Sequence, residues 1–393
     1  MSTMNDTYDT VVVGGGPAGA TAAHDLARAG RSVLLVDRAG RIKPCGGAIP
    51  PALIEEFDIP QSLLCARVNC ARMVSPAGRN VDMPINNGYV GMVNRDVFDE
   101  FLRERARESG ATRIAAKFER VERETGTTYV VLRVPDEASP RRVATRAVVG
   151  ADGAASEVAK QCVPGADEIR YVYAYHEIVR APASGFDGAR CDVYYQGPLS
   201  PDFYGWIFPH GDTASIGTGT AQRGFSIRNA VTALRAQTGL DTVETIRREG
   251  APIPMRPLRR WDDGHDVVLA GDAAGVVAPA SGEGIYYAMA GGRFAAQAIG
   301  EFLETGDARA LALARRRFMK AHGRVFWILG IMQRFWYAND KRRERFVSIC
   351  RDRDVQDLTW QSYMHKKLVR AKPLAHLRIF VKDLAHLAGV VRP

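Results

Sequence analysis

The N-terminal segment shows a strand, a tight turn, a helix and a second strand in quick succession. Residues 8–13 form a β-branched apolar run, and the glycine-rich residues 14–19 follow it at once. Residues 20–29 are rich in alanine and predict a helix that stops at Gly30, because glycine is favoured just past a helix end. The apolar residues 32–36 then predict a second buried strand.

The pattern changes twice further along the chain. Residues 93–110 have helical spacing, and residues 127–134 and 148–150 are apolar runs typical of strands. Residues 170–220 alternate aromatic with polar side chains and are broken by glycine and proline, which predicts an antiparallel sheet. Beyond Gly291 the pattern is helical, so a second layer and a helical end follow the first unit.

Composition narrows the class of protein. The chain has 393 residues, 46% hydrophobic and 25% charged, as expected of a globular protein with substantial cores. Its six cysteines form no C-x-x-C pair and its eight histidines show no metal spacing, so neither a disulfide framework nor a metal site is expected. The N-terminal residues do not resemble a signal peptide, and no apolar run reaches the ~18 residues of a membrane-spanning helix. We expect a protein on the cytoplasmic side.

The first glycine-rich turn has the chemistry of a dinucleotide site. Glycines let the backbone approach a pyrophosphate, the helix N-terminus supplies free N–H groups, and an acid after the next strand accepts from a ribose hydroxyl. A purely structural turn is the alternative. The candidate cofactor-binding residues here are Gly14, Gly16, Pro17, Ala18, Gly19, Asp37 and Arg38.

A second glycine-containing turn lies far along the chain. Residues 266–270 read as a strand that ends at Gly271-Asp272, which can also be explained as a helix N-cap. A two-part flavin site requires such a distant segment, so the pair favours FAD over NAD. A further turn leads into a helix and is suited to present backbone donors to an isoalloxazine ring, with Gly282, Gly284 and Ile285 as candidates.

These motifs resemble a known superfamily. The N-terminal motif, residues 149–153 (VGADG) and residues 271–275 (GDAAG) are similar to those of the FAD-dependent aromatic hydroxylases. More narrowly, residues 43–50 (KPCGGAIP) and 204–209 (YGWIFP) resemble the geranylgeranyl reductases, as do residues 279–285 (PASGEGI). The resemblance is strongest to those of chlorophyll and bacteriochlorophyll synthesis, and it extends through residues 364–387.

The resemblance implies an α/β fold with an FAD-binding Rossmann-type domain, an inserted antiparallel β-sheet substrate layer and a helical C-terminal extension. The expected segments are 1–165 (FAD-binding, first part), 166–255 (substrate sheet), 256–305 (FAD-binding, second part) and 306–393 (basic helical region).

The implied activity is reduction of three isolated double bonds of a geranylgeranyl chain to give phytyl, with NADPH as electron donor. The prenyl group would be carried on a pigment ester, on the free diphosphate, or on both. Competing readings are an FAD monooxygenase, an archaeal-type prenyl lipid reductase and a non-enzymatic flavin-binding membrane assembly protein.

Reduction of an unactivated alkene needs a hydride at one carbon and a positioned acid for the other. Cys45, with Gly46 and Gly47, follows the exit of the second strand and is a candidate for this acid or for a positioning group. A small buried hydrophobe is the alternative for this cysteine.

An apolar wall for a prenyl tail is expected at one strand. Tyr204, Trp206 and Phe208 alternate at strand spacing and therefore share a face. Together with Pro209, which is expected to begin the turn that ends the strand, they are the candidate substrate residues. Core packing explains the same alternation, so the pocket depends on the resemblance.

Two further residues are candidate cofactor contacts. Arg95, just before a helix, resembles a flavin-phosphate or adenosine contact, with a solvated surface arginine as the alternative. Asp152 resembles the family's Asp-Gly element and is expected to support FAD or NADPH binding. No second G-x-G-x-x-G occurs, so NADPH is expected to bind near the flavin without a Rossmann domain of its own.

Charge is concentrated near the C-terminus. Residues 311–393 hold 19 lysines and arginines against 6 acids, a net charge of +13. The whole chain carries +9, so the remaining residues carry −4. Basic residues mixed with aromatic ones predict peripheral contact with an anionic membrane, and a helical cap with solvated charges is the alternative. No nucleic-acid module is recognisable, so nucleic acid is not expected as a partner.

Overall fold

The computed structural model describes residues 7–38, 40 and 42–366. The chain divides into two compact units. Unit 1 draws on residues 1–43, 95–171 and 252–326, and unit 2 on residues 44–94, 172–251 and 327–393.

Unit 1 is built on a mixed seven-stranded sheet. Its strand order is β8-β2-β1-β11-β10-β9, and β17 pairs with β11. The strands are β1 (Thr7–Val13), β2 (Val33–Asp37), β8 (Thr112–Ala115), β9 (Lys117–Glu124), β10 (Thr127–Arg133), β11 (Arg141–Gly150) and β17 (Val267–Leu269). β1 is parallel to both β2 and β11, so the carboxyl ends of these three strands lie at one edge of the sheet.

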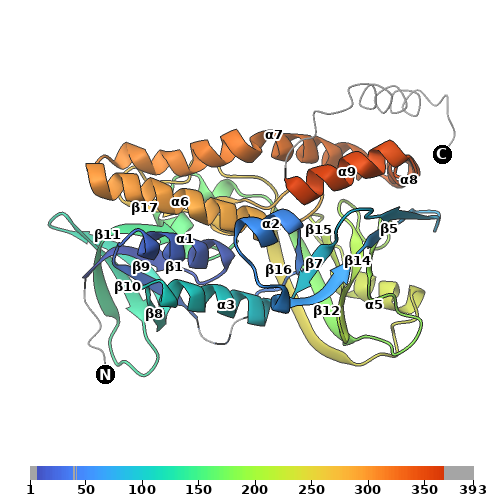
Figure 1. The fold of residues 1–393 in the computed structure, drawn as a ribbon, viewed down its shortest axis with the longest axis horizontal. Helices are drawn as coiled ribbons and strands as arrows, with labels where there is room; N and C mark the ends of the chain where they lie inside the picture. The colour runs from blue at the N-terminus through green and yellow to red at the C-terminus, as the bar shows by residue number, and fades with distance from the viewer. Residues whose placement is uncertain (1–6, 39, 41, 367–393) are drawn as a thin grey trace. The chain divides into compact units, whose positions relative to one another are not determined.

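The helices of unit 1 pack closely against one another because they carry small residues at their contacts. α1 (Pro17–Arg28) lies between α3 (Arg95–Glu108) and α6 (Ile285–Thr305), as Figure 1 shows. A Cβ on Gly292 of α6 would lie 2.1 Å from Ala18 O, so only glycine permits this approach of α6 to α1. The unit also contains α4 (Glu157–Cys162), η2 (Ala166–Glu168), η3 (Gly271–Ala274) and η4 (Ala308–Ala312).

Unit 2 is built on a second seven-stranded sheet, with the order β16-β12-β15-β14-β13-β5-β6. These strands are β5 (Cys70–Val74), β6 (Asn80–Pro84), β12 (Tyr171–Arg180), β13 (Arg190–Tyr194), β14 (Gly205–His210), β15 (Thr213–Thr220) and β16 (Thr245–Pro254). A small sheet of β3 (Ala48–Ile49), β7 (Val90–Val93) and β4 (Leu64–Val68) accompanies it. The predicted antiparallel sheet over residues 170–220 is present as β12 to β15.

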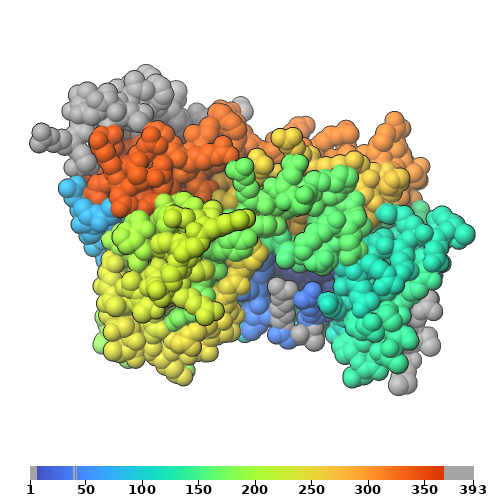
Figure 2. Space-filling view, turned by 180° about the vertical axis from the view of Figure 1, so that it is seen from behind, coloured from blue at the N-terminus to red at the C-terminus, as the bar shows by residue number. Residues whose placement is uncertain are grey.

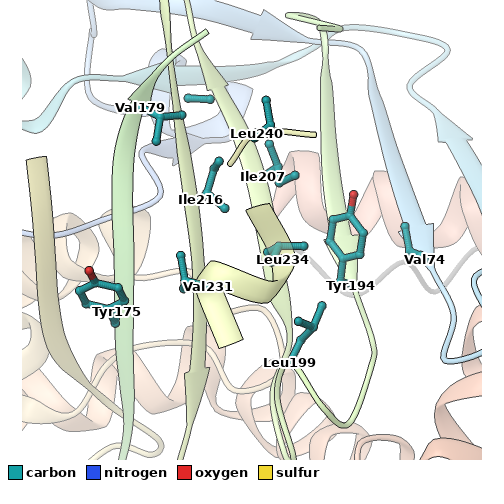
Figure 3. Close-up of a cluster of buried hydrophobic side chains, with 11 residues drawn as sticks. Val74, Tyr175, Val179, Tyr194, Leu199, Ile207, Ile216, Val231, Leu234 and Leu240 are labelled. Carbon is teal, nitrogen blue, oxygen red and sulfur yellow. The ribbon is translucent and has the colours of Figure 1, made fainter. Parts of the chain in front are cut away.

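One face of the large sheet of unit 2 packs on α5 (Ile227–Gln237). Val231 and Leu234 of α5 lie in one buried hydrophobic cluster with Ile207 of β14 and Ile216 of β15, as Figure 3 shows. In Figure 2 the segment from β13 to β16 forms the yellow-green and yellow surface. Because side chains alternate along a strand, residues 206, 208 and 210 of β14 point to the opposite face from Ile207.

The expected segment boundaries differ from the observed units in the region 44–94. The sequence boundaries assign these residues to the FAD-binding part, whereas their strands belong to sheets of unit 2. β5 pairs in parallel with β13, with Cys70 opposite Arg190 and Val74 opposite Tyr194.

The C-terminal part is helical as predicted, within the described residues. α7 (Leu313–Trp336), α8 (Asp340–Ile349) and α9 (Arg353–His365) follow one another, and α2 (Pro51–Glu56) contacts α9. Residues 367–393, which belong to the predicted basic region, lie outside the described residues.

Candidate functional site

The turn between β1 and α1 has the shape that a pyrophosphate requires. Gly14 has φ +106°, and a Cβ there would lie 2.3 Å from Ala151 O, so this position must be glycine. A Cβ on Gly19 would lie 1.8 Å from Gly14 O, which keeps the helix close to the turn. Gly16 differs, because a Cβ there would meet no atom of the described chain within 4 Å. Two glycines are thus required by packing, and Gly16 leaves open space for a ligand.

The distant Gly271-Asp272 turn lies against this first motif. A Cβ on Gly271 would lie 2.7 Å from the Cβ of Ala18, the second residue of α1. Pro17 begins α1, where its missing N–H costs no hydrogen bond. Segments some 250 residues apart in sequence therefore meet in one place, as the two-part site requires.

The turn before α6 completes this group. Its backbone is tight, with Gly282 N donating to Ala278 O at 3.0 Å, and Gly282 has φ +66°. Gly284 is the N-cap of α6, and a Cβ there would lie 3.8 Å from Asp272 Oδ1. Ile285 is the first residue of α6 and is buried.

Two basic residues that were not among the predicted site residues contact the predicted acids. Arg103 Nη1 of α3 donates to Asp37 Oδ2 at 3.1 Å and to Gly15 O at 3.3 Å, which fixes the carboxylate beside the glycine turn. Lys43 forms an ion pair with Asp272, whose side chain is 11% exposed. Arg38, a predicted contact, is exposed. Lys43 begins the 43–50 motif but was not itself a predicted contact, and Arg103 belongs to no motif.

The carboxylate of Asp152 accepts hydrogen bonds from backbone N–H groups of the chain itself. Its Oδ2 accepts from Glu157 N at 2.7 Å and Val158 N at 3.2 Å, and Ser156 Oγ donates to its Oδ1. Burial raises the pKa of this carboxyl, and the three donors oppose that rise. The carboxylate therefore stabilises the start of α4, and its support of FAD or NADPH binding stays a prediction.

Arg95 is not a solvated surface residue. It is 6% exposed and forms a two-pronged ion pair with Asp99, with Nε–Oδ1 at 2.8 Å and Nη2–Oδ2 at 2.7 Å. The alternative of a solvated surface arginine is therefore wrong. The contact of Arg95 with a flavin stays a prediction.

In unit 2, an aromatic row runs along β14. Tyr204 and Trp206 have ring centroids 6.0 Å apart, and Trp206 and Phe208 have centroids 6.2 Å apart. These three side chains share one face, as predicted. Pro209 does not, because alternation puts it on the face of Ile207. The strand continues through His210, and the hairpin turn is Gly211-Asp212, so the turn begins two residues later than expected.

The Cys45-Gly46-Gly47 turn lies at the end of this aromatic row. A Cβ on Gly46 would lie 2.9 Å from Phe208 Cδ2, so the turn and the ring are in contact. Cys45 is partly exposed, and its Sγ accepts from Gly47 N at 3.4 Å. It is therefore not the fully buried hydrophobe of the alternative reading.

The unit 1 geometry fits a flavin dinucleotide. Backbone N–H groups at the start of α1 and open space at Gly16 suit a pyrophosphate, and Asp37 suits a ribose hydroxyl. Asp272 and the Gly282–Gly284 turn would hold the remaining polar atoms. Among the described residues, no cluster of histidine, cysteine or acidic side chains has the arrangement of a metal site.

Comparisons with known proteins agree with this geometry. A family model described as lycopene cyclase protein matches residues 9–382. The geranylgeranyl diphosphate reductase of Rhodobacter capsulatus is 58% identical over 388 residues, which cover 98% of this chain and 99% of that protein.

Two solved structures share the fold. A geranylgeranyl bacteriochlorophyll reductase-like protein from Thermoplasma acidophilum has a TM-score of 0.81 at 23% identity, covering 93% of this chain and 98% of that one. The flavin-dependent brominase Bmp2 has a TM-score of 0.73 at 16% identity, covering 96% and 99%. The predicted α/β fold class is therefore confirmed, and it is a fold that flavin-dependent enzymes use. By its family model the chain belongs to the lycopene cyclase protein family, and by its full-length relative it belongs to the geranylgeranyl reductases.

Proposed function

We propose that this chain reduces the isolated double bonds of a geranylgeranyl chain to phytyl, using FAD that NADPH reduces again after each turnover. The prenyl group is carried on a chlorophyll or bacteriochlorophyll ester, on geranylgeranyl diphosphate, or on both. The relative's name supports the prenyl substrate, and the two-part glycine site of unit 1 supports FAD.

One observation carries the proposal: the aromatic row of β14 leads directly to the Cys45 turn. A prenyl chain lying along Trp206 and Phe208 would bring an alkene to that turn, because Gly46 touches Phe208. Such rings supply apolar area and exclude water from the reacting carbons.

The chemistry then divides between cofactor and protein. When bound, reduced FAD supplies the hydride equivalent. The protein must supply one proton to the second alkene carbon, and the partly exposed thiol of Cys45 is the proposed donor. Each double bond thus gains one hydride and one proton, and the thiol is reprotonated from solvent before the next reduction.

The test is an anaerobic assay with purified, FAD-loaded protein, NADPH, and either geranylgeranyl diphosphate or the geranylgeranyl ester of bacteriochlorophyll. Product mass is expected to rise by one, two and then three H2 equivalents. If turnover requires oxygen and adds an oxygen atom, the monooxygenase reading replaces the proposal. If the protein binds FAD but changes neither substrate, the lipid reductase and assembly readings are tested with prenylated phospholipid.

We also propose peripheral contact with an anionic membrane. Helix α7 contains no acidic residue, and Trp327 and Ile331, one turn apart on it, are 68% and 47% exposed. Exposed aromatic and aliphatic side chains beside basic ones suit a lipid headgroup region. Within the described part of the chain, no helix has the length and apolarity to cross a bilayer.

Sedimentation with vesicles tests this contact. Vesicles with anionic lipid are expected to retain the protein at low salt and release it at high salt. The double substitution Trp327→Ser and Ile331→Ser is expected to weaken retention, with Val97→Ser as an exposed control on unit 1. Equal binding to neutral vesicles, or none to either kind, contradicts the proposal.

A further inference from the structure

The Cys45-Gly46-Gly47 turn is fixed through its backbone carbonyls. Gly47 O accepts from Val93 N at 2.9 Å, which anchors the turn to β7. Gly46 O lies 3.1 Å from Nε2 of His210, the last residue of β14. One imidazole therefore joins the end of the aromatic strand to the turn that carries Cys45.

Packing shows that this contact is close. Gly47 has φ +72°, and a Cβ there would lie 2.6 Å from His210 Cε1 and 2.5 Å from Val93 O. Any side chain at position 47 would push the imidazole away, whatever backbone strain it also caused. Glycine at this position keeps the turn against the ring.

The hydrogen bonds determine the tautomer of His210. A carbonyl oxygen only accepts, so Nε2 must carry the hydrogen. The side chain is 5% exposed, and burial lowers its pKa to about 4, with His176 and Arg247 acting in the same direction. The ring is therefore neutral near pH 7, and Nδ1 is an acceptor.

Two groups lie near that acceptor. The structure places Asn94 Oδ1 3.1 Å from Nδ1, and Cys65 Sγ is 3.5 Å from it. An amide oxygen and Nδ1 are both acceptors and would repel each other at this distance. We therefore exchange the amide oxygen and nitrogen of Asn94, so that the nitrogen donates to Nδ1. With its one hydrogen held by Gly46 O, His210 has no proton to give to an alkene.

We propose that His210 is a positioning residue for this reductase: its Nε2–H holds Gly46 O and thereby fixes the direction of the Cys45 thiol at the end of the aromatic row. The inference rests on the proposed role of Cys45. It extends that role, because a three-residue turn with two glycines has little intrinsic stiffness. A small misplacement of a proton donor lowers the rate of proton transfer more than it weakens substrate binding.

Two substitutions separate the hydrogen bond from simple packing. In His210→Gln the side-chain amide can still donate to Gly46 O, whereas in His210→Asn it is too short to reach. We expect His210→Asn to lower kcat with geranylgeranyl diphosphate about tenfold, with KM changed by less than about twofold. His210→Gln is expected to recover most of kcat. His265→Gln, at an exposed histidine of unit 1, is the control.

A double-mutant cycle gives the discriminating readout. In a Cys45→Ala background, His210→Asn is expected to lower kcat no further, because the group it positions is gone. Loss of kcat by the same factor in both backgrounds, or wild-type kcat in His210→Asn, would overturn the proposal.

Alkylation of the Cys45 thiol tests the same idea without turnover. In the FAD-loaded protein, peptide mapping is expected to show a severalfold change in alkylation rate at Cys45 in His210→Asn, and little change in His210→Gln. If Cys45→Ala keeps full turnover while alkylation still responds to position 210, the catalytic role fails but the positioning contact stands. An unchanged alkylation rate in His210→Asn refutes the contact itself.

Discussion

Trp206 Nε1 donates a 3.1 Å hydrogen bond to Ser215 Oγ, which joins the aromatic row of β14 to the neighbouring strand β15. Ser215 Oγ also lies 2.8 Å from His176 Nδ1. His176 Nε2 is 3.1 Å from Glu249 Oε2, an ion-pair distance without the alignment of a straight hydrogen bond. The hydroxyl therefore links a buried polar group to the ring that we propose contacts the prenyl chain.

Ser215→Ala is expected to destabilise unit 2 and to weaken substrate binding. The indole N–H would lose its acceptor while buried, which costs about 1–3 kcal/mol. The melting temperature should fall, and KM for geranylgeranyl diphosphate should rise more than kcat changes. Thr232→Ala on the exposed side of α5 is the control and should alter neither quantity. An unchanged KM would show that the orientation of Trp206 does not matter for binding.

Gly16→Ala and Gly14→Ala form a matched pair for the cofactor site. A Cβ on Gly16 enters open space, so the variant should fold but bind FAD at least about tenfold more weakly, because the methyl group occupies the approach of the pyrophosphate. A Cβ on Gly14 collides with the backbone of Ala151, so that variant should lose folded protein.

The measurements are FAD retained on purification, the dissociation constant by quenching of flavin fluorescence, and the melting temperature of apoprotein. Wild-type FAD affinity in Gly16→Ala would place the pyrophosphate elsewhere.

Local motifs predicted the parts of the molecule that depend on neighbouring residues. The turn at Gly14–Gly19 and the Gly271-Asp272 turn were recognisable because each needs glycine within a few positions of a strand end. The face shared by Trp206 and Phe208 followed from the two-residue period of a strand.

Contacts between distant segments could not be predicted in this way. Arg103 reaches Asp37 from 66 residues away, and His210 reaches Gly46 from 164 residues away. A lone basic residue on a helix, or a histidine at a strand end, gives no periodic signal of its partner. The same reason explains why the sequence grouped residues 44–94 with the FAD-binding part although their strands pair in the sheets of unit 2. Alternation shows that a segment is a strand but not which strand it pairs with.

Cys45→Ala is expected to retain FAD and lower kcat by about 10²–10⁴-fold, the usual contribution of a positioned acid. Cys45→Ser should keep part of the rate, since a hydroxyl can occupy the same place while being a weaker acid. The readouts are product mass under anaerobic conditions and the flavin absorbance of the purified variants. Cys70→Ala, at a partly exposed cysteine of β5, is the control. Full turnover by Cys45→Ala would mean that another group delivers the proton.

The neutral form of buried His210 predicts how stability depends on pH. Its pKa is about 4 in the folded protein and near 6.5 in the unfolded chain, so between these values the unfolded chain binds more protons. The free energy of unfolding is therefore expected to fall as pH drops from 6.5 to 4, by about 3 kcal/mol from this residue.

His210→Gln removes the titrating ring but keeps a donor for Gly46 O, so its stability should fall less steeply over the same pH range. Other groups, such as the partly buried Glu249, titrate in both proteins, and the difference between the two curves isolates position 210. Denaturant unfolding at several pH values from 7 to 4 measures that difference. Parallel curves would mean that His210 is accessible to protons in the folded state, which would contradict the neutral, Nε2-protonated ring assigned to it.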